Sequence, residues 1–382
     1  MKFSYRCSEC GAGFEIAPGI MVCPECSRKQ QPDRPLRGVL EVALEGEAAA
    51  DFRVFDLLPV PERFFPPIPV GNTPLWRPER LRKRLGFSHL SLKDDTLNPT
   101  GSFKDRASYL VAAFARRHGL KEVVVASTGN AASSMAGVGA AAGLAVSIYI
   151  PKTAPQAKMV QSLQYGARVT LVDGSYDQAY EISLEYSRAN GALNRNTAYN
   201  PLTIEGKKTV SLELFRQIPE GLDALFLPVG DGVILSGVYK GFRDLLQLGL
   251  LARLPQIYAV QAEGSDAICR ANAAGEFAPP RVSQTVADSI AVDIPRGGYL
   301  ALKYLRLFEG RCLTVSDDEI LVAQKELASG CGLFAEPAAA AAFAGFLKEK
   351  NKLPADCRAT VLVTGNGLKD IKTAMMGITL PE

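Results

Sequence analysis

The sequence contains very little histidine and tryptophan and almost no excess of either charge. Only two histidines, His89 and His118, occur among 382 residues. A histidine triad is therefore not favoured, and a lysine, a carboxylate or a cofactor is expected to carry any chemistry. The 43 Lys and Arg residues against 40 Asp and Glu leave a net charge of +3. A protein that binds nucleic-acid phosphates over a wide surface is normally far more basic, so we expect no nucleic-acid partner.

The sequence also lacks an N-terminal export signal and a clear membrane span. No apolar segment precedes Cys7, so secretion and disulfide bonds are not expected. Residues 123–150 carry no charge and are long enough to cross a bilayer. They are nevertheless rich in Gly, Ser and Asn, and a buried strand, loop, helix and strand explain them better. We expect a soluble cytoplasmic protein without a membrane partner.

The composition and the order of apolar segments predict an α/β protein. Hydrophobic residues make up 47% and charged residues 22%, which is ordinary for globular proteins, and the length predicts two or three domains. Residues 122–150, 224–248 and 359–368 each begin with a short apolar run that leads into a Gly-containing turn. Such runs, alternating with helices, indicate buried parallel strands. The expected fold is doubly wound and two-lobed.

Four of the eight cysteines form two CxxC pairs, Cys7 with Cys10 and Cys23 with Cys26. Two such turns can complete a tetrahedral zinc site. Because four thiolates leave no open position on the metal, the zinc is expected to be structural rather than catalytic. Redox-active or metal-free turns are the alternative. A zinc ribbon that binds a macromolecular partner is the non-enzymatic hypothesis.

Glycine-rich or hydroxyl-rich turns follow three of the predicted strands, where ligands bind in open parallel sheets. Each precedes a helix N-terminus, which attracts anions. The turn Gly230-Asp-Gly232 matches neither common nucleotide-binding pattern. Lys104 follows another Gly-containing turn, and a lysine can form a Schiff base with an aldehyde. Together these features indicate pyridoxal phosphate, which requires a lysine, a phosphate cradle and a partner for its ring nitrogen.

Four segments resemble motifs of threonine synthases, which belong to the tryptophan-synthase-β-like (fold type II) pyridoxal-phosphate enzymes. Residues 98–106 resemble the cofactor-lysine motif, and Ser127-Thr-Gly-Asn130 resembles the substrate-carboxylate loop. Residues 200–209 are similar to the Asn-Pro…Glu-Gly-Gln-Lys-Thr segment, and residues 364–370 resemble the C-terminal loop. The N-terminal cysteine ribbon also occurs in this family. The resemblance spans most of the chain in order.

The resemblance implies a domain division and residue roles. A zinc-ribbon segment (1–35) would precede a large cofactor-binding domain (36–104 and 202–382), interrupted by a small domain (105–201). Lys104 would bond the cofactor and then shuttle protons. Phe103 would lie against the ring, Asn130 would hydrogen-bond its phenolic oxygen and Thr364 would face its nitrogen. The other cofactor-binding residues would be Gly230, Asp231, Gly232, Val233 and Ile234. The substrate residues would be Ser127, Thr128, Asn130, Ala131 and Lys207.

The implied reaction converts the amino acid O-phospho-L-homoserine and water into L-threonine and phosphate, and the implied assembly is a homodimer. The chain departs from the family where the substrate's phosphate is held. Thr197-Ala198 replaces Asn-Ser and Thr203 replaces an Arg, which removes a bidentate guanidinium. Lys207, in place of Gln, is expected to restore part of the charge.

The turn in residues 228–237 also reads more like that of serine/threonine dehydratases, and Asp231 is unusual beside a phosphate. Two alternatives therefore stay open. One is a paralogue that performs β-elimination or β-replacement on a hydroxy- or phospho-amino acid, like a dehydratase or a cysteate synthase. The other is a zinc-ribbon interaction protein on an inactive scaffold.

Overall fold

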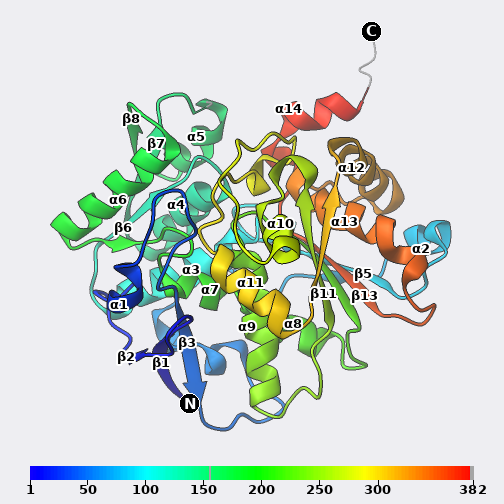
Figure 1. The fold of residues 1–382 in the computed structure, drawn as a ribbon, viewed down its shortest axis with the longest axis horizontal. Helices are drawn as coiled ribbons and strands as arrows, with labels where there is room; N and C mark the ends of the chain where they lie inside the picture. Colours follow the sequence, from blue (N-terminus) through cyan, green and yellow to red (C-terminus); the bar gives the residue numbers. More distant parts are fainter. Residues whose placement is uncertain (155, 379–382) are drawn as a thin grey trace.

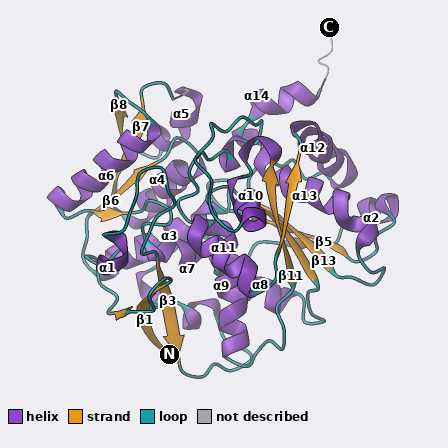
Figure 2. Ribbon diagram, in the orientation of Figure 1, coloured by secondary structure: helices purple, strands orange, loops and turns teal. Residues whose placement is uncertain are grey.

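The chain contains three β-sheets. Figure 1 shows the fold coloured along the sequence. The structure, a computed structural model, describes residues 1–154 and 156–378. A four-stranded and a six-stranded sheet form the centres of two lobes, and a three-stranded sheet lies at the N-terminus. Figure 2 shows helices around both larger sheets. This is the two-lobed, doubly wound α/β fold predicted from the sequence.

The smaller lobe is built on the parallel sheet β8-β7-β6-β9. Its strands are β6 (Glu122–Ala126), β7 (Ala145–Pro151), β8 (Arg168–Val172) and β9 (Leu193–Asn194). Its helices are α3 (Lys104–Arg117), α4 (Asn130–Ala142), α5 (Gln156–Gln164) and α6 (Tyr176–Asn190). The uncharged residues 123–150 thus form a strand, a loop, a helix and a strand, as predicted. Across residues 1–154 and 156–378, no helix has the length and apolar character that crossing a membrane requires.

The larger lobe contains the sheet β12-β11-β10-β13-β5-β4, which is parallel except at its edge strand β4. The strands are β4 (Leu75–Trp76), β5 (Leu90–Asp94), β10 (Ala224–Pro228), β11 (Gln256–Ala262), β12 (Arg311–Val315) and β13 (Ala359–Val363). Alternate residues of β10 enter separate cores: Leu225 and Leu227 pack into one, and Ala224 and Phe226 into the other. Burial on both faces explains why the strand is apolar throughout.

Helices cover both faces of this sheet. One core includes residues of α7 (Pro201–Lys207), α8 (Thr209–Gln217), α9 (Val233–Gln247), α10 (Ala267–Ala274) and α11 (Gly298–Leu307). The other includes residues of α2 (Glu79–Leu85), α12 (Asp317–Cys331) and α13 (Pro337–Glu349). The short helix α14 (Ile371–Ala374) lies near the C-terminus. Single-turn 3-10 helices occur at Val54–Leu57, Glu62–Phe64, Asp95–Leu97, Glu263–Ser265, Asp288–Ile290, Lys350–Lys352, Gly367–Lys369 and Met375–Gly377.

The N-terminal sheet is antiparallel, in the order β2-β1-β3. It comprises β1 (Lys2–Cys7), β2 (Gly13–Phe14) and β3 (Leu40–Glu45), and the short helix α1 (Pro24–Ser27) lies between β2 and β3 in the chain. Glu41 of β3 accepts hydrogen bonds from Arg243 of α9, at 3.3 Å, and from the Tyr304 hydroxyl of α11. This sheet is therefore bound to the larger lobe, and its third strand lies beyond the segment boundary predicted at residue 35.

Candidate active site

Lys104 is the first residue of α3 and lies close to the carboxyl ends of two strands. Because β5 and β13 are parallel neighbours, the connections that leave them start at the same edge of the sheet. The Phe103 N–H donates to the Thr364 carbonyl at 2.8 Å, and the Asn366 N–H donates to the Gly101 carbonyl at 3.0 Å. These backbone hydrogen bonds fix the turn that presents Lys104.

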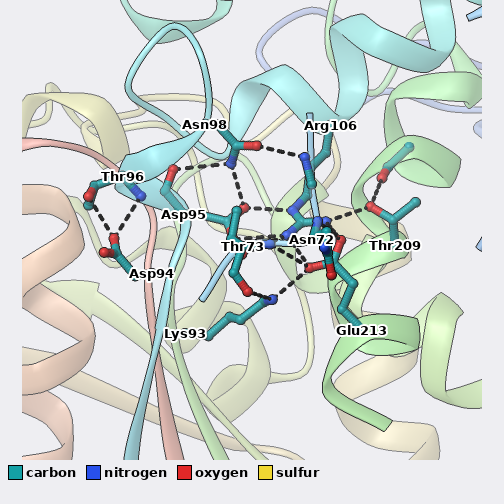
Figure 3. A network of polar contacts seen from close by, with 12 residues as sticks. Asn72, Thr73, Lys93, Asp94, Asp95, Thr96, Asn98, Arg106, Thr209 and Glu213 are labelled. Carbon is teal, nitrogen blue, oxygen red and sulfur yellow. Dashed lines mark hydrogen bonds and ion pairs between the residues drawn. The ribbon is translucent and has the colours of Figure 1, made fainter. Parts of the chain in front are cut away.

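A buried network of ion pairs, centred on Arg106, holds the beginning of α3 (Figure 3). The guanidinium donates to Asp95 at 2.6 and 2.9 Å and to Glu213 at 2.6 and 2.9 Å. Lys93 forms a further 2.6 Å ion pair with Glu213. Burial raises the pKa of the Glu213 carboxyl, but the charges of Arg106 and Lys93 outweigh burial and lower it to about 2. The helix that carries Lys104 is thus anchored two residues further along.

The turns predicted to bind cofactor and substrate converge on one pocket of about 550 Å³. The predicted residues that line it are Lys104, Ser127, Thr128, Asn130, Ala131, Gly230, Asp231 and Ile234. The predicted residues that are buried in or beside the same turns, without lining the pocket, are Phe103, Lys207, Gly232, Val233 and Thr364. Segments separated by more than a hundred residues therefore form a single site.

Asp231 occupies the turn that a cofactor phosphate would approach. Its carboxylate accepts a hydrogen bond from the Val233 N–H at 3.0 Å, at the N-terminus of α9. Gly232 has φ +87°, a conformation that favours glycine. A Cβ atom at Gly230 would lie 2.9 Å from the Ile290 Cα. The turn therefore requires its glycines, and Asp231 satisfies one of the helix's free amides.

Three cationic side chains surround Asp231. Burial lowers the pKa of Lys104, and the charge of Asp231 opposes that shift only in part. Burial also lowers the pKa of Lys207, well below its usual value, and that of Arg195 to about 10. Burial alone would raise the pKa of Asp231, but the charges of Lys207 and Lys104 lower it. Three cationic groups thus lie near this one carboxylate, while the rest of the pocket lining includes Asp177, Asp288, Asp293 and Arg296.

A second buried carboxylate lies beside Asn130. The Asn130 side-chain amide donates to Glu336 at 2.9 and 3.1 Å and to the Ser289 hydroxyl at 3.2 Å. Burial raises the pKa of Glu336, while its hydrogen bond from Asn130 and the charge of Lys369 counteract the rise only partly. Glu336 therefore adds less negative charge to the site than an ordinary glutamate would.

These groups fit a phosphate-bearing aldehyde. Lys104 is half-buried, and burial lowers its pKa, which increases the neutral form that can attack a carbonyl. The α9 N-terminus and the cations near Asp231 favour a phosphate. Asp231 opposes one by its charge and by taking the Val233 amide. Three nearby cations, Lys104, Lys207 and Arg195, offset that single charge.

Several site residues were missed in the sequence. Arg195 and Tyr176 line the pocket, as do Asp177 and Arg296, which form an ion pair with each other. The sequence around Glu336 gives only a weak indication of a site residue: Glu336 precedes a Pro at the start of an Ala-rich helix. Arg195 has none, because β9, the strand before it, is only two residues long.

The four N-terminal cysteines come together as their spacing predicts. Their Sγ atoms all lie within 4.8 Å of one another, and those of Cys10 and Cys23 are 3.8 Å apart. Zinc–sulfur bonds of about 2.3 Å place tetrahedral ligands about 3.8 Å apart. The cluster therefore has dimensions that suit a tetrahedral metal ion.

Residues 68–365 match the family model described as pyridoxal-phosphate dependent enzyme. A threonine synthase of Methanosarcina acetivorans is 33% identical over 391 residues, which cover 98% of this chain and 94% of that protein. A threonine synthase of Mycobacterium tuberculosis is 35% identical over 84% of this chain and 88% of its own length.

Solved structures with the same fold include enzymes of other activities. Maize serine racemase superposes with a TM-score of 0.70 at 24% identity, covering 80% of this chain and 92% of its own. The processed form of threonine deaminase isoform 2 from Solanum lycopersicum has a TM-score of 0.71 at 23% identity, with 88% and 96% coverage. At these identities the structural similarity establishes the fold alone.

Proposed function

This chain belongs to the pyridoxal-phosphate dependent enzymes and, within them, to the threonine synthase family, and from that premise we propose that it converts O-phospho-L-homoserine and water into L-threonine and phosphate. The observation that carries the proposal is the pocket itself. It combines a half-buried lysine of lowered pKa, a glycine-containing turn at a helix N-terminus, and the cations Arg195 and Lys207 close to Asp231. The family, the cofactor and the class of enzyme, a pyridoxal-phosphate-dependent lyase, are those predicted from the sequence.

Each side chain has a role in this proposal. Bound in the pocket, the cofactor supplies an electron sink for negative charge next to the substrate's amino group. Lys104 attaches the cofactor and, when released, moves protons at the substrate carbons. Asn130 and Thr364 orient the cofactor ring, and Phe103 packs against it. Gly230, Asp231, Gly232, Val233 and Ile234 form the turn that receives its phosphate.

The turn after β6 is proposed to bind the substrate's α-carboxylate. Ser127 and Thr128 present hydroxyl groups to the pocket, and Ala131 lies in the first turn of α4. A helix N-terminus offers free N–H groups and a favourable dipole to a carboxylate. The amino acid would therefore be held by its carboxylate in the small lobe and by its reacting carbons at Lys104.

A specific observation supports a second candidate, β-elimination or β-replacement on a hydroxy- or phospho-amino acid. Thr203, at the position of the family's phosphate-binding Arg, is fully buried, and its hydroxyl donates to the Asn200 carbonyl at 2.8 Å. Ala198 offers no side-chain donor. Two of the positions that hold the substrate's phosphate in relatives, those of Ala198 and Thr203, are thus unable to do so here.

A substrate panel separates the two functions. Purified enzyme with bound cofactor would be given O-phospho-L-homoserine, L-threonine, L-serine and O-phospho-L-serine with sulfite. Phosphate and threonine formed together from the first compound would support the proposal. Keto-acid formation from the hydroxy-amino acids, or cysteate from the last, without threonine synthesis would favour the second candidate. A protein without the absorbance of a lysine-bound cofactor would favour the interaction protein on an inactive scaffold.

We propose that Cys7, Cys10, Cys23 and Cys26 bind one structural zinc ion. The spacing of their sulfur atoms supports this, and the closed ligand set argues against a catalytic metal. Metal analysis of protein purified without added zinc, with the four-serine variant as control, tests it. One zinc per chain in the wild type and none in the variant is the expected result.

We also propose a cytoplasmic homodimer. All eight cysteines are free, which suits a reducing compartment, and the resemblance implies the dimer. Sedimentation equilibrium should give twice the 41.0 kDa mass of one chain. Fractionation of cells that express the full chain tests the location.

A further inference from the structure

Arg195 is a buried guanidinium with an unsatisfied nitrogen in the wall of the pocket. Its backbone N–H donates to the Val124 carbonyl at 2.7 Å, which extends the pairing of β9 with β6. Its side chain is 1% exposed, and its Nε donates weakly to the Ser108 hydroxyl at 3.3 Å. Its Nη2 has no hydrogen-bond partner among the described residues. Leaving a buried charged donor unpaired is costly.

Lys207 is similarly under-satisfied. It is 1% exposed, and its Nζ donates only to the Thr197 hydroxyl, at a long 3.3 Å. The Thr197 side chain also contributes to lowering the pKa of Asp231. Within the described parts of the chain, neither Lys207 nor Arg195 has a carboxylate within ion-pair distance.

Two fully buried cations packed nearby, Lys208 and Arg106, are paired, which distinguishes Arg195 and Lys207 from them. Lys208, next to Lys207, contacts both Glu205 and Asp244. Arg106 contacts two carboxylates through all three guanidinium nitrogens. Lys208 and Arg106 are thus neutralised by carboxylates within the fold. Arg195 and Lys207, beside the pocket, have no such carboxylate, and a ligand can supply the missing negative charge.

We propose that Arg195 and Lys207, together with the Thr197 hydroxyl, form a subsite for the phosphate monoester on the substrate's side chain. The inference rests on the proposed function and adds the residues that recognise its substrate. Arg195 and Lys207 take the place of the guanidinium that relatives carry where this chain has Thr203. The phosphate group of the cofactor has the same chemistry, so the experiment must tell the two sources apart.

Charge balance supports a doubly charged ligand. The ionisable groups near Arg195 and Lys207 include Lys104, Asp231 and Tyr176, and the pocket is also lined by Asp177, Asp288, Asp293 and Arg296. Glu336, near Lys104, has a raised pKa. A phosphate monoester carries about −1.5 to −2 charges at neutral pH and would give Arg195 and Lys207 the counter-charge that no described carboxylate supplies within ion-pair distance.

The test compares Arg195→Met and Lys207→Met with Arg168→Met, which removes an exposed cation that pairs with Glu122 on the sheet of the same lobe. For each variant three quantities are measured: KM for O-phospho-L-homoserine, the Kd of inorganic phosphate for the cofactor-loaded protein, and the affinity of the apoprotein for pyridoxal phosphate. Loss of a charge-assisted hydrogen bond should weaken the first two about ten- to a hundredfold. Cofactor affinity should change less than about twofold, and Arg168→Met should change nothing.

The outcomes are distinct. Weaker binding of the cofactor with unchanged phosphate Kd would assign the two cations to the cofactor and overturn the proposal, as would no change in any quantity. If the wild type does not turn over O-phospho-L-homoserine but binds phosphate through Arg195, the subsite stands and the proposed function fails. Thermal melting excludes misfolding. Because Arg195 lacks an ion-pair partner, Arg195→Met should not lower Tm, and Arg195→Lys should restore part of the phosphate affinity.

Discussion

Removing Arg106 should destabilise this protein more than removing any exposed cation. Its side chain is fully buried, and four charge-assisted hydrogen bonds of 2.6–2.9 Å join it to Asp95 and Glu213. Arg106→Met fills similar volume but leaves both carboxylates short of their counter-charge. Breaking a buried ion pair by removing one partner costs about 3–5 kcal/mol.

The pKa of Glu213 gives a second value, of similar size, for the stability that this network contributes. It falls from 4.5 to about 2, and 2.5 units at about 1.4 kcal/mol each correspond to about 3 kcal/mol. Arg106 and Lys93 share that contribution. Because the folded-state pKa is depressed, this stability is complete above pH 4.5 and is lost as the pH falls toward 2. In Arg106→Met the pKa of Glu213 should rise, so acid unfolding should begin at a higher pH.

Urea denaturation measures the effect, with Trp76 as probe. It is the only tryptophan and lies in β4, which pairs with β5 beside the network. The matched control is Arg77→Met, which removes an exposed 3.0 Å pair with Glu220 and should cost less than about 1 kcal/mol. An Arg106→Met protein within 1 kcal/mol of wild type, or one indistinguishable from the control, would refute the reasoning. The network would then be a weak contributor whose desolvation cancels its attraction.

Three further predictions concern the site and the cysteine cluster. Lys104→Ala should lose both turnover and the absorbance of the lysine-bound cofactor while its circular dichroism spectrum stays that of the wild type; retained activity would exclude Lys104 as the attachment point. Cys10→Ser should lower the bound zinc and the Tm by more than it lowers kcat, and an unchanged zinc content would remove Cys10 from the ligand set. Because burial depresses the pKa of Lys207, a phosphate dianion should bind with proton uptake and lose affinity as the pH rises through that pKa. Lys207→Arg should flatten this dependence, and an equally steep profile in that variant would assign the titration to Lys104 or Asp231.

The order of elements and the positions of the functional turns could be read from the sequence, since both depend on local features. An apolar run such as 224–228 identifies a strand buried on two faces, and the glycines at 230 and 232 mark the turn that follows. The cysteine pairs lie close together in the chain, so their spacing alone predicts that the sulfur atoms meet. The motif around Lys104, a turn that precedes a helix, predicts the lysine that binds the cofactor.

The charges of the site depended on the tertiary structure. Lys207 and Lys208 are adjacent in the chain, and both are lysines. One is neutralised by Glu205 and Asp244 across helices, while the other is left beside Asp231. Which of them lies beside Asp231 follows from how α7 packs against α9, and no local pattern records that.

Arg195 shows the same limit most clearly. Nothing near it in the chain distinguishes it from a solvated arginine after a short strand, and only the pairing of β9 with β6 buries its guanidinium in the pocket wall. The sequence by itself determined the fold and the cysteine cluster and predicts the cofactor lysine, because each rests on neighbouring residues. The tertiary structure decided which cations stay unpaired, because burial and counter-charges come from segments far apart in the chain.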